Sequence, residues 1–467
     1  MLQQVRPSFG GEESFQRARR HVLSQLVSFG RHTISGLLRT QARHQQDWSA
    51  DYRFYSQDRV DPQTLFQTVR QQVEGRLAAG APLVVAMDDS LLRKTGRKIH
   101  GVRYHRDPMS PPFAINFVRG LRVLQISAAV PQGDGGARLV PIDFEHAVLP
   151  AKPPRQATAQ QWALYRKERA QRNLNCIGAE RLRSLRQQMD EGGGLSRQLV
   201  VNVDGRFTNS TVLKAIPGRT TLIGRVRKDA QLYYLPAQQP ERGRKRKYGA
   251  VAPTPEELLL DESIPWQKVR AYACGKGHDF EIKRVGPLLA RMDRGAHRVQ
   301  LVVIKPLKYR LSQSQLCYRQ PAFLLCTDAE LALEELLQSY LWRWDIEVNF
   351  RDEKTLLGVG QAQVRTEASN RNTPALAVCA YALLLMASLK TYGPKGGPDR
   401  LQSPKWYRRR AEQRATTSEL INQLRYELWS PALSVRHFRD FSTLGRADAK
   451  FEKSDVPLGP AAFLSLK

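Results

Sequence analysis

Cysteine is scarce in this chain, and its spacing argues against two common uses of the residue. The five cysteines, at positions 176, 274, 317, 326 and 379, are odd in number, scattered, and never form a C-x-x-C pair. The pattern argues against a disulfide framework and against a structural zinc site. The nine histidines contain no H-x-x-x-H pair either. This composition suits a reducing cytoplasm.

Long hydrophobic runs are also lacking. The N-terminal stretch MLQQVRPSFGGEESF has no apolar core of the kind found in a signal peptide. The nearest approach to a membrane span is 372–390, NTPALAVCAYALLLMASLK, which is uncharged for only 18 residues and is bounded by Arg371 and Lys390. Since a spanning helix needs about 20 strongly apolar residues, we expect a buried core helix here and no membrane association.

Acidic residues are outnumbered, with 44 Asp and Glu against 73 Lys and Arg, so the formal net charge is +29. The chain has 467 residues, of which 41% are hydrophobic, enough for two or three globular domains. Such an excess of positive charge favours a polyanionic partner. An anionic membrane surface is the competing partner, but no basic amphipathic helix with an aromatic-rich face is present. Nucleic acid is therefore favoured.

Changes in hydrophobic pattern divide the chain into five segments. Residues 1–80 have helical spacing and are predicted to form a helical N-terminal DNA-binding region. Residues 81–214 run through strands, helix and strand, as in an α/β layer. Residues 215–329 carry short β-like runs between Gly and Pro loops and are predicted to be a β-rich insertion. Residues 330–400 return to helix and complete the α/β domain, and 401–467 form a basic C-terminal region.

Three basic stretches leave two interpretations open. Arg and Lys cluster at 242–247 and at 405–414 (KWYRRRAEQR), and Lys94, Arg97, Lys98 and His100 follow the first strand in a loop. Each stretch can contact a phosphate backbone, or it can be a solvated loop.

Two strand-like runs end in an aspartate and echo one another. LVVAMD at 83–88 and LVVNVD at 199–204 both read as short buried strands. Aspartate after a strand is also a common turn former or helix cap. Because side chains alternate along a strand, the echo places Asp88, rather than its neighbour Asp89, in register with Asp204.

A third acidic residue lies in the helical stretch 339–361, SYLWRWDIEVNFRDEKTLLGVGQ. At 100° per residue, four side chains share an arc of about 60°: Tyr340, Arg343, Glu347 and Lys354. An amphipathic surface helix can produce such a face without any chemistry. A carboxylate beside a tyrosine and two cations, however, suits a metal-bound phosphodiester.

The spacing Y-x2-R-x3-E-x6-K resembles the signature of the Y-R-E-K group of bacterial insertion-sequence DDE transposases. AMDDS resembles the group's first motif, D-x-[ST], with Asp88 as the acid and Ser90 as the hydroxyl. VNVDGRF resembles its second, with Asp204 as the acid and Phe207 just beyond. The resemblance covers roughly residues 80–390, which lie after a helical N-terminal part that is also typical of the group.

The resemblance implies an α/β fold, with an RNase H-like mixed sheet and flanking helices, a β-rich insertion and a helical N-terminal domain. It implies that Asp88, Asp204 and Glu347 are catalytic and bind Mg²⁺, with Mn²⁺ able to substitute. The implied reaction has two stages: water cuts the transposon end to free a 3′-OH, and this 3′-OH attacks the target strand.

The resemblance also implies DNA-binding roles for Tyr340, Arg343 and Lys354. Relatives that form a DNA hairpin stack an extruded base on the residue after the motif arginine, here Trp344, although tryptophans on such a helix often only pack. The implied partners are terminal inverted repeats, target DNA and a second copy in the DNA-bound complex, in the bacterial cytoplasm at the nucleoid. An RNase H-like DNA nuclease and a domesticated, inactive DNA-binding relative are the alternatives.

Overall fold

The structure is a computed structural model that describes residues 1–107, 110–111, 113–237, 243, 245–291, 296–310, 316–394 and 414–429. The chain forms two compact units. Unit 1 combines Met1–Leu65 with Arg351–Lys467, and unit 2 is Phe66–Phe350. Each unit is described by itself below.

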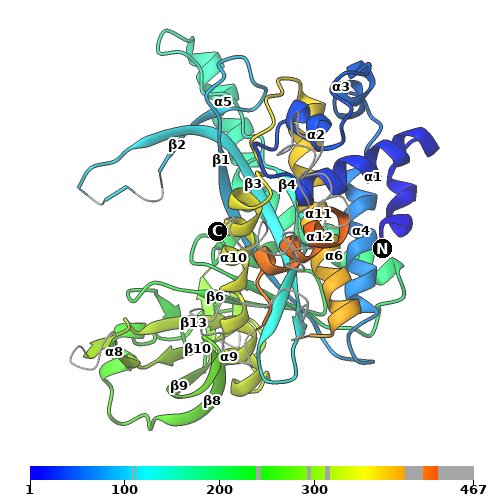
Figure 1. The fold of residues 1–467 in the computed structure, drawn as a ribbon. Coiled ribbons are helices and arrows are strands. Elements are labelled where there is room, and N and C mark those ends of the chain that lie inside the picture. The colour runs from blue at the N-terminus through cyan, green and yellow to red at the C-terminus, as the bar shows by residue number, and fades with distance from the viewer. Residues whose placement is uncertain are drawn as a thin grey trace. The chain divides into compact units, whose positions relative to one another are not determined.

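Unit 2 is built on a large mixed sheet, seen as the arrows of Figure 1. Within the described residues this sheet has 11 strands, whose bounds are β1 (Leu83–Arg93), β2 (Arg103–Arg106), β3 (Phe117–Pro131), β4 (Ala137–His146), β5 (Leu199–Val203), β6 (Thr220–Arg225), β7 (Leu232–Tyr233), β8 (Gln267–Ala273), β9 (Lys276–Arg291), β10 (Ala296–Ile304) and β13 (Ala322–Cys326). A separate two-stranded sheet pairs β11 (Lys308–Arg310) with β12 (Leu316–Tyr318).

The first part of the sheet has the order β4-β3-β1-β5-β6. Strand β3 is antiparallel to both β4 and β1, whereas β5 is parallel to both β1 and β6. Three antiparallel strands are thus followed by two parallel ones, which require helical crossovers between them. The RNase H-like mixed sheet implied by the resemblance is confirmed.

The β-rich stretch continues this sheet. Strand β13 pairs antiparallel with the outer side of β6, and β10, β9 and β8 follow it. The edge of the parallel part is therefore covered by strands that come later in the chain. The five-segment domain division remains a prediction.

Helices cover both faces of the sheet in unit 2. Because side chains alternate, Met87 points to one face, where it lies near Gly178 and Phe207. Val84 and Ala86 point to the other face and share a hydrophobic cluster that also contains Ile346 and Phe350. The helices of unit 2, or reaching into it, are α4 (Pro62–Glu74), α5 (Ala159–Gln171), α6 (Leu174–Glu191), α7 (Ser210–Ala215), α8 (Pro255–Leu260), α9 (Leu333–Trp342) and α10 (Asp345–Thr355).

Unit 1 is helical and is organised around one long apolar helix. Its elements are the 3₁₀ helix η1 (Leu2–Ser8), α1 (Glu12–Val27), α2 (Ile34–Thr40), α3 (Ser49–Ser56), α11 (Glu367–Tyr392) and α12 (Thr417–Trp429). Helix α11 is the one described helix long and apolar enough to cross a membrane, yet 89% of its apolar window is buried. It packs against α1 and α3. It is therefore a core helix, as predicted, while most of the basic stretch 405–414 falls outside the described residues.

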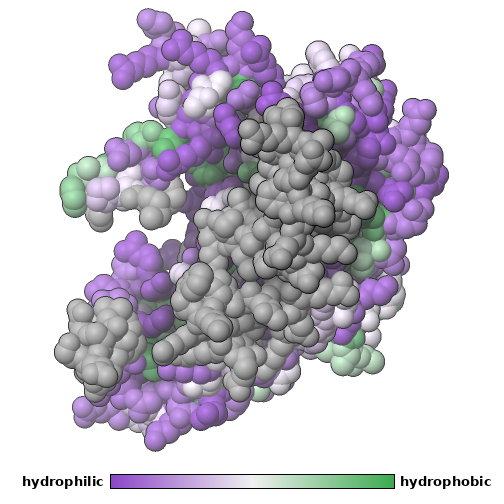
Figure 2. Space-filling model, viewed as in Figure 1, coloured by the Kyte–Doolittle hydropathy of each residue, from purple (hydrophilic) through white to green (hydrophobic). Residues whose placement is uncertain are grey.

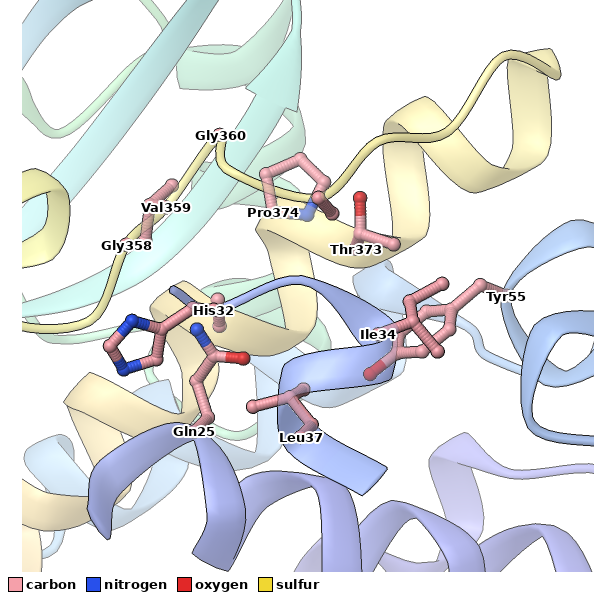
Figure 3. Close-up of a pocket in the computed structure, with 12 residues that line it drawn as sticks. Gln25, His32, Ile34, Leu37, Tyr55, Gly358, Val359, Gly360, Thr373 and Pro374 are labelled. Carbon is pink, nitrogen blue, oxygen red and sulfur yellow. The ribbon is translucent and has the colours of Figure 1, made fainter. Parts of the chain in front are cut away.

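A small pocket opens in unit 1 beneath the loop at Gly358–Gly360 (Figure 3). His32 and Gln25 line it on one side, and Pro374 of α11 lies on the other. The twelve lining residues shown include no carboxylate, lysine or arginine. Burial lowers the pKa of His32 and favours the neutral imidazole. This pocket does not have the groups that phosphoryl transfer requires.

Candidate active site

The two echoing runs are neighbouring parallel strands. Residues 83–87 of β1 pair in register with residues 199–203 of β5, from Leu83 opposite Leu199 to Met87 opposite Val203. Asp204 directly follows β5, as predicted, but β1 continues to Arg93, so the prediction that this strand ends at Asp88 is wrong. The register still places the two aspartates side by side on neighbouring strands. The two similar sequences are thus paired residue by residue in the sheet.

The turn after β5 fixes the position of Asp204. Its Oδ1 accepts hydrogen bonds from the backbone N–H of Arg206 (3.0 Å) and of Phe207 (3.4 Å). Phe207 is fully buried and anchors the turn in the core. Asp204 is therefore the turn former that its position after a strand suggests, and its second carboxylate oxygen makes no part of this turn.

The surroundings of Asp88 disfavour its ionised form. The side chain is 17% exposed, and its Oδ1 accepts a hydrogen bond from the backbone N–H of Asp89 (2.8 Å). Burial, and next the negative charge of Asp204, raise the pKa of Asp88 to about 7. Two carboxylates thus share a weakly solvated site, a situation that favours either a proton or a cation between them.

Asp89 has its own cationic partners. Its Oδ2 lies 2.5 Å from Nη1 of Arg122, and its Oδ1 lies 3.5 Å from Nε of Arg206. Burial is the main reason that the pKa of Asp89 is raised, and the two arginines oppose that effect. Asp89 is thus neutralised within the protein, which supports the choice of Asp88 as the acid of the site.

Arg343 connects the strands with the following helix. Its guanidinium lies 3.6 Å from Asp88 Oδ2 and 3.6 Å from Glu347 Oε1, and 5.6 Å from the centre of the Tyr340 ring. Burial raises the pKa of Glu347, and the charge of Asp204 raises it further. The same charge of Asp204 acts on Tyr340, whose pKa is raised chiefly by burial. Five of the residues singled out from the sequence therefore form one cluster.

The helix that carries them is not continuous, so the prediction of one uninterrupted helix through this stretch is wrong. Helix α9 ends at Trp342 and α10 starts at Asp345. Between them the backbone N–H groups of Arg343, Ile346 and Glu347 bond three residues back rather than four, the tighter 3₁₀ pattern. The indole of Trp342 donates to the carbonyl of Gly135 (2.8 Å), which fixes the end of α9. Arg343 and Glu347 still meet because they remain four residues apart across the turn.

The structure does not join the two remaining predicted DNA-binding residues to this cluster. Lys354 belongs to unit 1, so its position relative to the acids is not defined. Trp344 lies in the turn between the helices and is 62% exposed, whereas Trp342 is partly buried against the core. The packing interpretation therefore fits Trp342 and not Trp344.

Two arginines of the site were missed from the sequence. Arg206 lies in the VNVDGRF motif, two residues after Asp204, and that position could have drawn attention to it. Arg122 carries no such signal. It reaches Asp89 diagonally, because Asp89 is paired with Leu124 on β3.

Among the described residues, no three His, Cys, Asp or Glu side chains already form a metal-binding group. The chemistry of the donors nevertheless fits a hard divalent cation, since Asp88, Asp204 and Glu347 supply carboxylate oxygens. Burial is the main cause of the raised pKa values of Asp88 and Glu347, and the negative charge of Asp204 adds to both. Arg343 offsets part of it from 3.6 Å.

Residues 4–280 match the family of DDE superfamily endonucleases, and the chain belongs to this family. The match includes Asp88 and Asp204 and ends before the α9–α10 segment. Enzymes of this superfamily use divalent metal ions, and the family implies DNA as the substrate. A search of the curated proteins found no match.

Proposed function

We propose that this protein is a DNA transposase of the Y-R-E-K group, which cuts transposon ends and joins the 3′-OH to target DNA. The observation that carries the proposal is the Arg343 bridge between Asp88 and Glu347, beside Asp204. This bridge connects Asp88, which lies inside the family match, with Arg343 and Glu347, which lie outside it. An RNase H-like nuclease that only cuts would share the three acids but would need neither a helical N-terminal DNA-reading region nor the β-rich insertion.

We assign Asp88, Asp204 and Glu347 as the residues that hold Mg²⁺, with Mn²⁺ as a substitute. When bound, two such cations activate the attacking oxygen and stabilise the leaving one in an in-line displacement at phosphorus. The raised pKa of Asp88 means that, near neutral pH, this carboxyl releases its proton readily once a positive charge is near.

Arg343 has two roles in this scheme. Without DNA, its guanidinium offsets the charges of Asp88 and Glu347. With DNA bound, the same planar fork turns to two oxygens of a phosphate at the cut end. Tyr340 lies against the guanidinium and orients it. Lys354 is assigned to a further phosphate, and the exposed Trp344 to an extruded base.

The proposed partners follow from this chemistry. The helical region 1–80 would recognise terminal inverted repeats, and the remaining basic surface would hold target DNA. We propose that two copies bridge two transposon ends, in the bacterial cytoplasm at the nucleoid. The net charge of +29 supports a DNA partner, because positive charge gathers phosphates without regard to sequence.

The test uses DNA that flanks the gene and contains any inverted repeats found there. We expect Asp88→Asn, Asp204→Asn and Glu347→Gln each to abolish Mg²⁺-dependent cleavage while binding in EDTA stays within about twofold of wild type, since binding rests on basic residues. Asp345→Asn, at the start of the same helix, is the matched control and should cleave normally.

Three other outcomes would overturn the proposal in distinct ways. Cleavage without joined strand-transfer products would identify a plain nuclease. Binding without cleavage by the wild-type protein in Mg²⁺ or Mn²⁺ would identify an inactive, domesticated relative. Normal cleavage by Glu347→Gln would remove this residue from the site.

A further inference from the structure

Strand β2 and the start of β3 form a two-stranded projection from the body of unit 2 (Figure 1). We call residues 103–119 the arm. Figure 2 shows hydrophobic and hydrophilic residues side by side on this projection. Its described large hydrophobic residues are mostly exposed: Tyr104 (71%), Phe113 (91%), Ile115 (52%) and Phe117 (64%).

One face of the arm alternates aromatic rings with arginines. Tyr104 is paired with Arg119, and Arg106 is paired with Phe117. Directly opposed residues in an antiparallel pair project to the same face, as do residues two apart on one strand. All four side chains therefore share one face, and the Arg119 guanidinium lies 6.0 Å from the centre of the Tyr104 ring.

This face continues the side of the sheet that carries Asp88. Strand β3 pairs with β1 without a register shift from Ala128 to Gly120, and Asp88 is opposite Gln125. Phe117 and Arg119 are separated from Gln125 by even numbers of residues, so they alternate onto the face of Asp88. At about 3.3 Å per residue, Phe117 lies roughly 25 Å along the strand from the acid.

The base of the arm is basic and is fastened to the neighbouring loop. Arg119 donates hydrogen bonds to the carbonyls of Thr95 (3.5 Å) and Arg97 (3.0 Å). Arg93, at the end of β1, is paired with Gly120 and therefore projects to the opposite face, where it forms an ion pair with Asp107 (3.3 Å). Arg106 and Arg119 thus alternate with the two rings on one face, and exposed aromatic residues among cations are the features that bind single-stranded nucleic acid.

We propose that the arm binds unpaired bases of the DNA strand that leaves the catalytic edge. Tyr104 and Phe117 stack on successive bases, and Arg106 and Arg119 hold the intervening phosphates. The proposal rests on the proposed function, because cutting and joining a DNA end exposes unpaired bases near Asp88. A second copy of the chain is the competing occupant, but an arginine-rich face on a chain of charge +29 favours a polyanion.

The test compares binding to a dT30 single strand and to a 30-base-pair duplex of mixed sequence, by fluorescence anisotropy in EDTA. Both rings are exposed, so Tyr104→Ala and Phe117→Ala are expected to fold normally. Each should weaken dT30 binding about tenfold, which corresponds to ~1.4 kcal/mol of stacking, and duplex binding less than twofold. Tyr234→Ala is the matched control, because Tyr234 is an aromatic residue that is 42% exposed elsewhere in unit 2.

A second readout reports stacking directly. 2-Aminopurine placed in the single strand should be quenched or shifted on binding wild-type protein, and this change should be lost in Tyr104→Ala/Phe117→Ala. Arg106→Ala should lower the salt dependence of dT30 binding by one phosphate equivalent, while the 2-aminopurine signal persists.

Other results would overturn the proposal. Equal losses on dT30 and duplex would show that the arm contacts only the backbone. Unchanged binding, with a shift from dimer to monomer in sedimentation, would show that the arm joins two copies. If wild type bound neither DNA, the proposed function itself would fail, whereas normal duplex binding with unaffected dT30 binding would remove only the arm proposal.

Discussion

Asp88 and Asp89 are adjacent, yet Asp88 lies beside another acidic side chain and Asp89 lies beside basic ones. Asp88 faces Asp204, and its nearest cation is Arg343 at 3.6 Å. Asp89 faces Arg122 at 2.5 Å, with both side chains largely buried. Consecutive side chains of a strand point to opposite faces. Asp88 therefore faces the proposed metal site, whereas Asp89 forms an ion pair with Arg122 on the other face.

We predict that neutralising these two residues changes stability to different extents. The folded-state pKa of Asp88 is raised from 3.8 to about 7, so its contribution to stability is lost as the pH rises from about 4 to 7. Asp88→Asn should therefore stabilise the metal-free protein at pH 8, by about 1–3 kcal/mol. Asp89→Asn should stabilise it less than Asp88→Asn does, because the release of a buried charge whose pKa is raised is offset when Arg122 loses its buried ion-pair partner.

Urea unfolding in EDTA measures both changes, and a cleavage assay complements it. We expect Asp88→Asn to be inactive and Asp89→Asn to cleave at temperatures where it is folded. An inactive but folded Asp89→Asn beside an active Asp88→Asn would reverse the assignment.

Arg343 can be separated from Glu347 by conservative substitutions. Arg343→Lys keeps the charge and loses the planar fork, so DNA-end binding and cleavage should both fall about tenfold or more, and extra Mg²⁺ should restore neither. Glu347→Asp should bind DNA normally and cleave poorly, with partial recovery in Mn²⁺. Gel shifts and cleavage in both metals measure these effects, and wild-type behaviour of Arg343→Lys would make it an ordinary surface arginine.

At the scale of the element, the loop after α10 depends on one glycine. Gly358 has φ +60°, and a Cβ there would lie 2.7 Å from Cβ and Nδ1 of His32. Gly80, in the turn before β1, has a similar φ of +75°, and no described atom lies within 4 Å of a Cβ placed there. Gly80→Ala should therefore cost about 1 kcal/mol of stability, from backbone strain alone, and Gly358→Ala about 2 kcal/mol more.

Thermal or urea unfolding of the two glycine variants gives this difference. Equal losses would mean that the loop moves away from His32 without penalty. The comparison isolates packing, because both residues lie in the left-handed region that favours glycine.

The sequence predicts a helix or strand well only where the element requires a regular pattern of apolar residues. The β1–β5 pair was predictable because two buried parallel strands need the same apolar run, here 83–87 and 199–203. Strand β9 was missed because it contains Gly286 and Pro287, which the sheet tolerates only at the register shift opposite Gln300. The break between α9 and α10 contains no glycine or proline that would predict it. Trp342 there donates a hydrogen bond to Gly135, a residue from elsewhere in the chain, and the local sequence does not show this contact.

For the whole molecule, the charge of +29 makes a quantitative prediction. The logarithm of the DNA-binding constant should fall with the logarithm of salt concentration, with a slope of about −0.9 for each phosphate contacted. Arg343→Ala should reduce that slope by about one contact. Arg227→Ala, which removes an exposed arginine paired with Asp229, should leave it unchanged.

Titration of binding at salt concentrations between about 50 and 200 mM measures the slope. A value near zero would exclude DNA as the partner. Liposome binding would then have to be measured.

The antiparallel pairing of β6 with β13 also has a consequence for folding during synthesis on the ribosome. Strand β6 is buried apart from its ends, and its outer edge is covered by a strand that emerges roughly 100 residues later. At about 5–20 residues per second, a ribosome leaves that apolar edge uncovered for ~5–20 s in every nascent chain. During this interval the chain depends on chaperones, and on spacing between ribosomes, to prevent neighbouring nascent chains from pairing through the edge of β6.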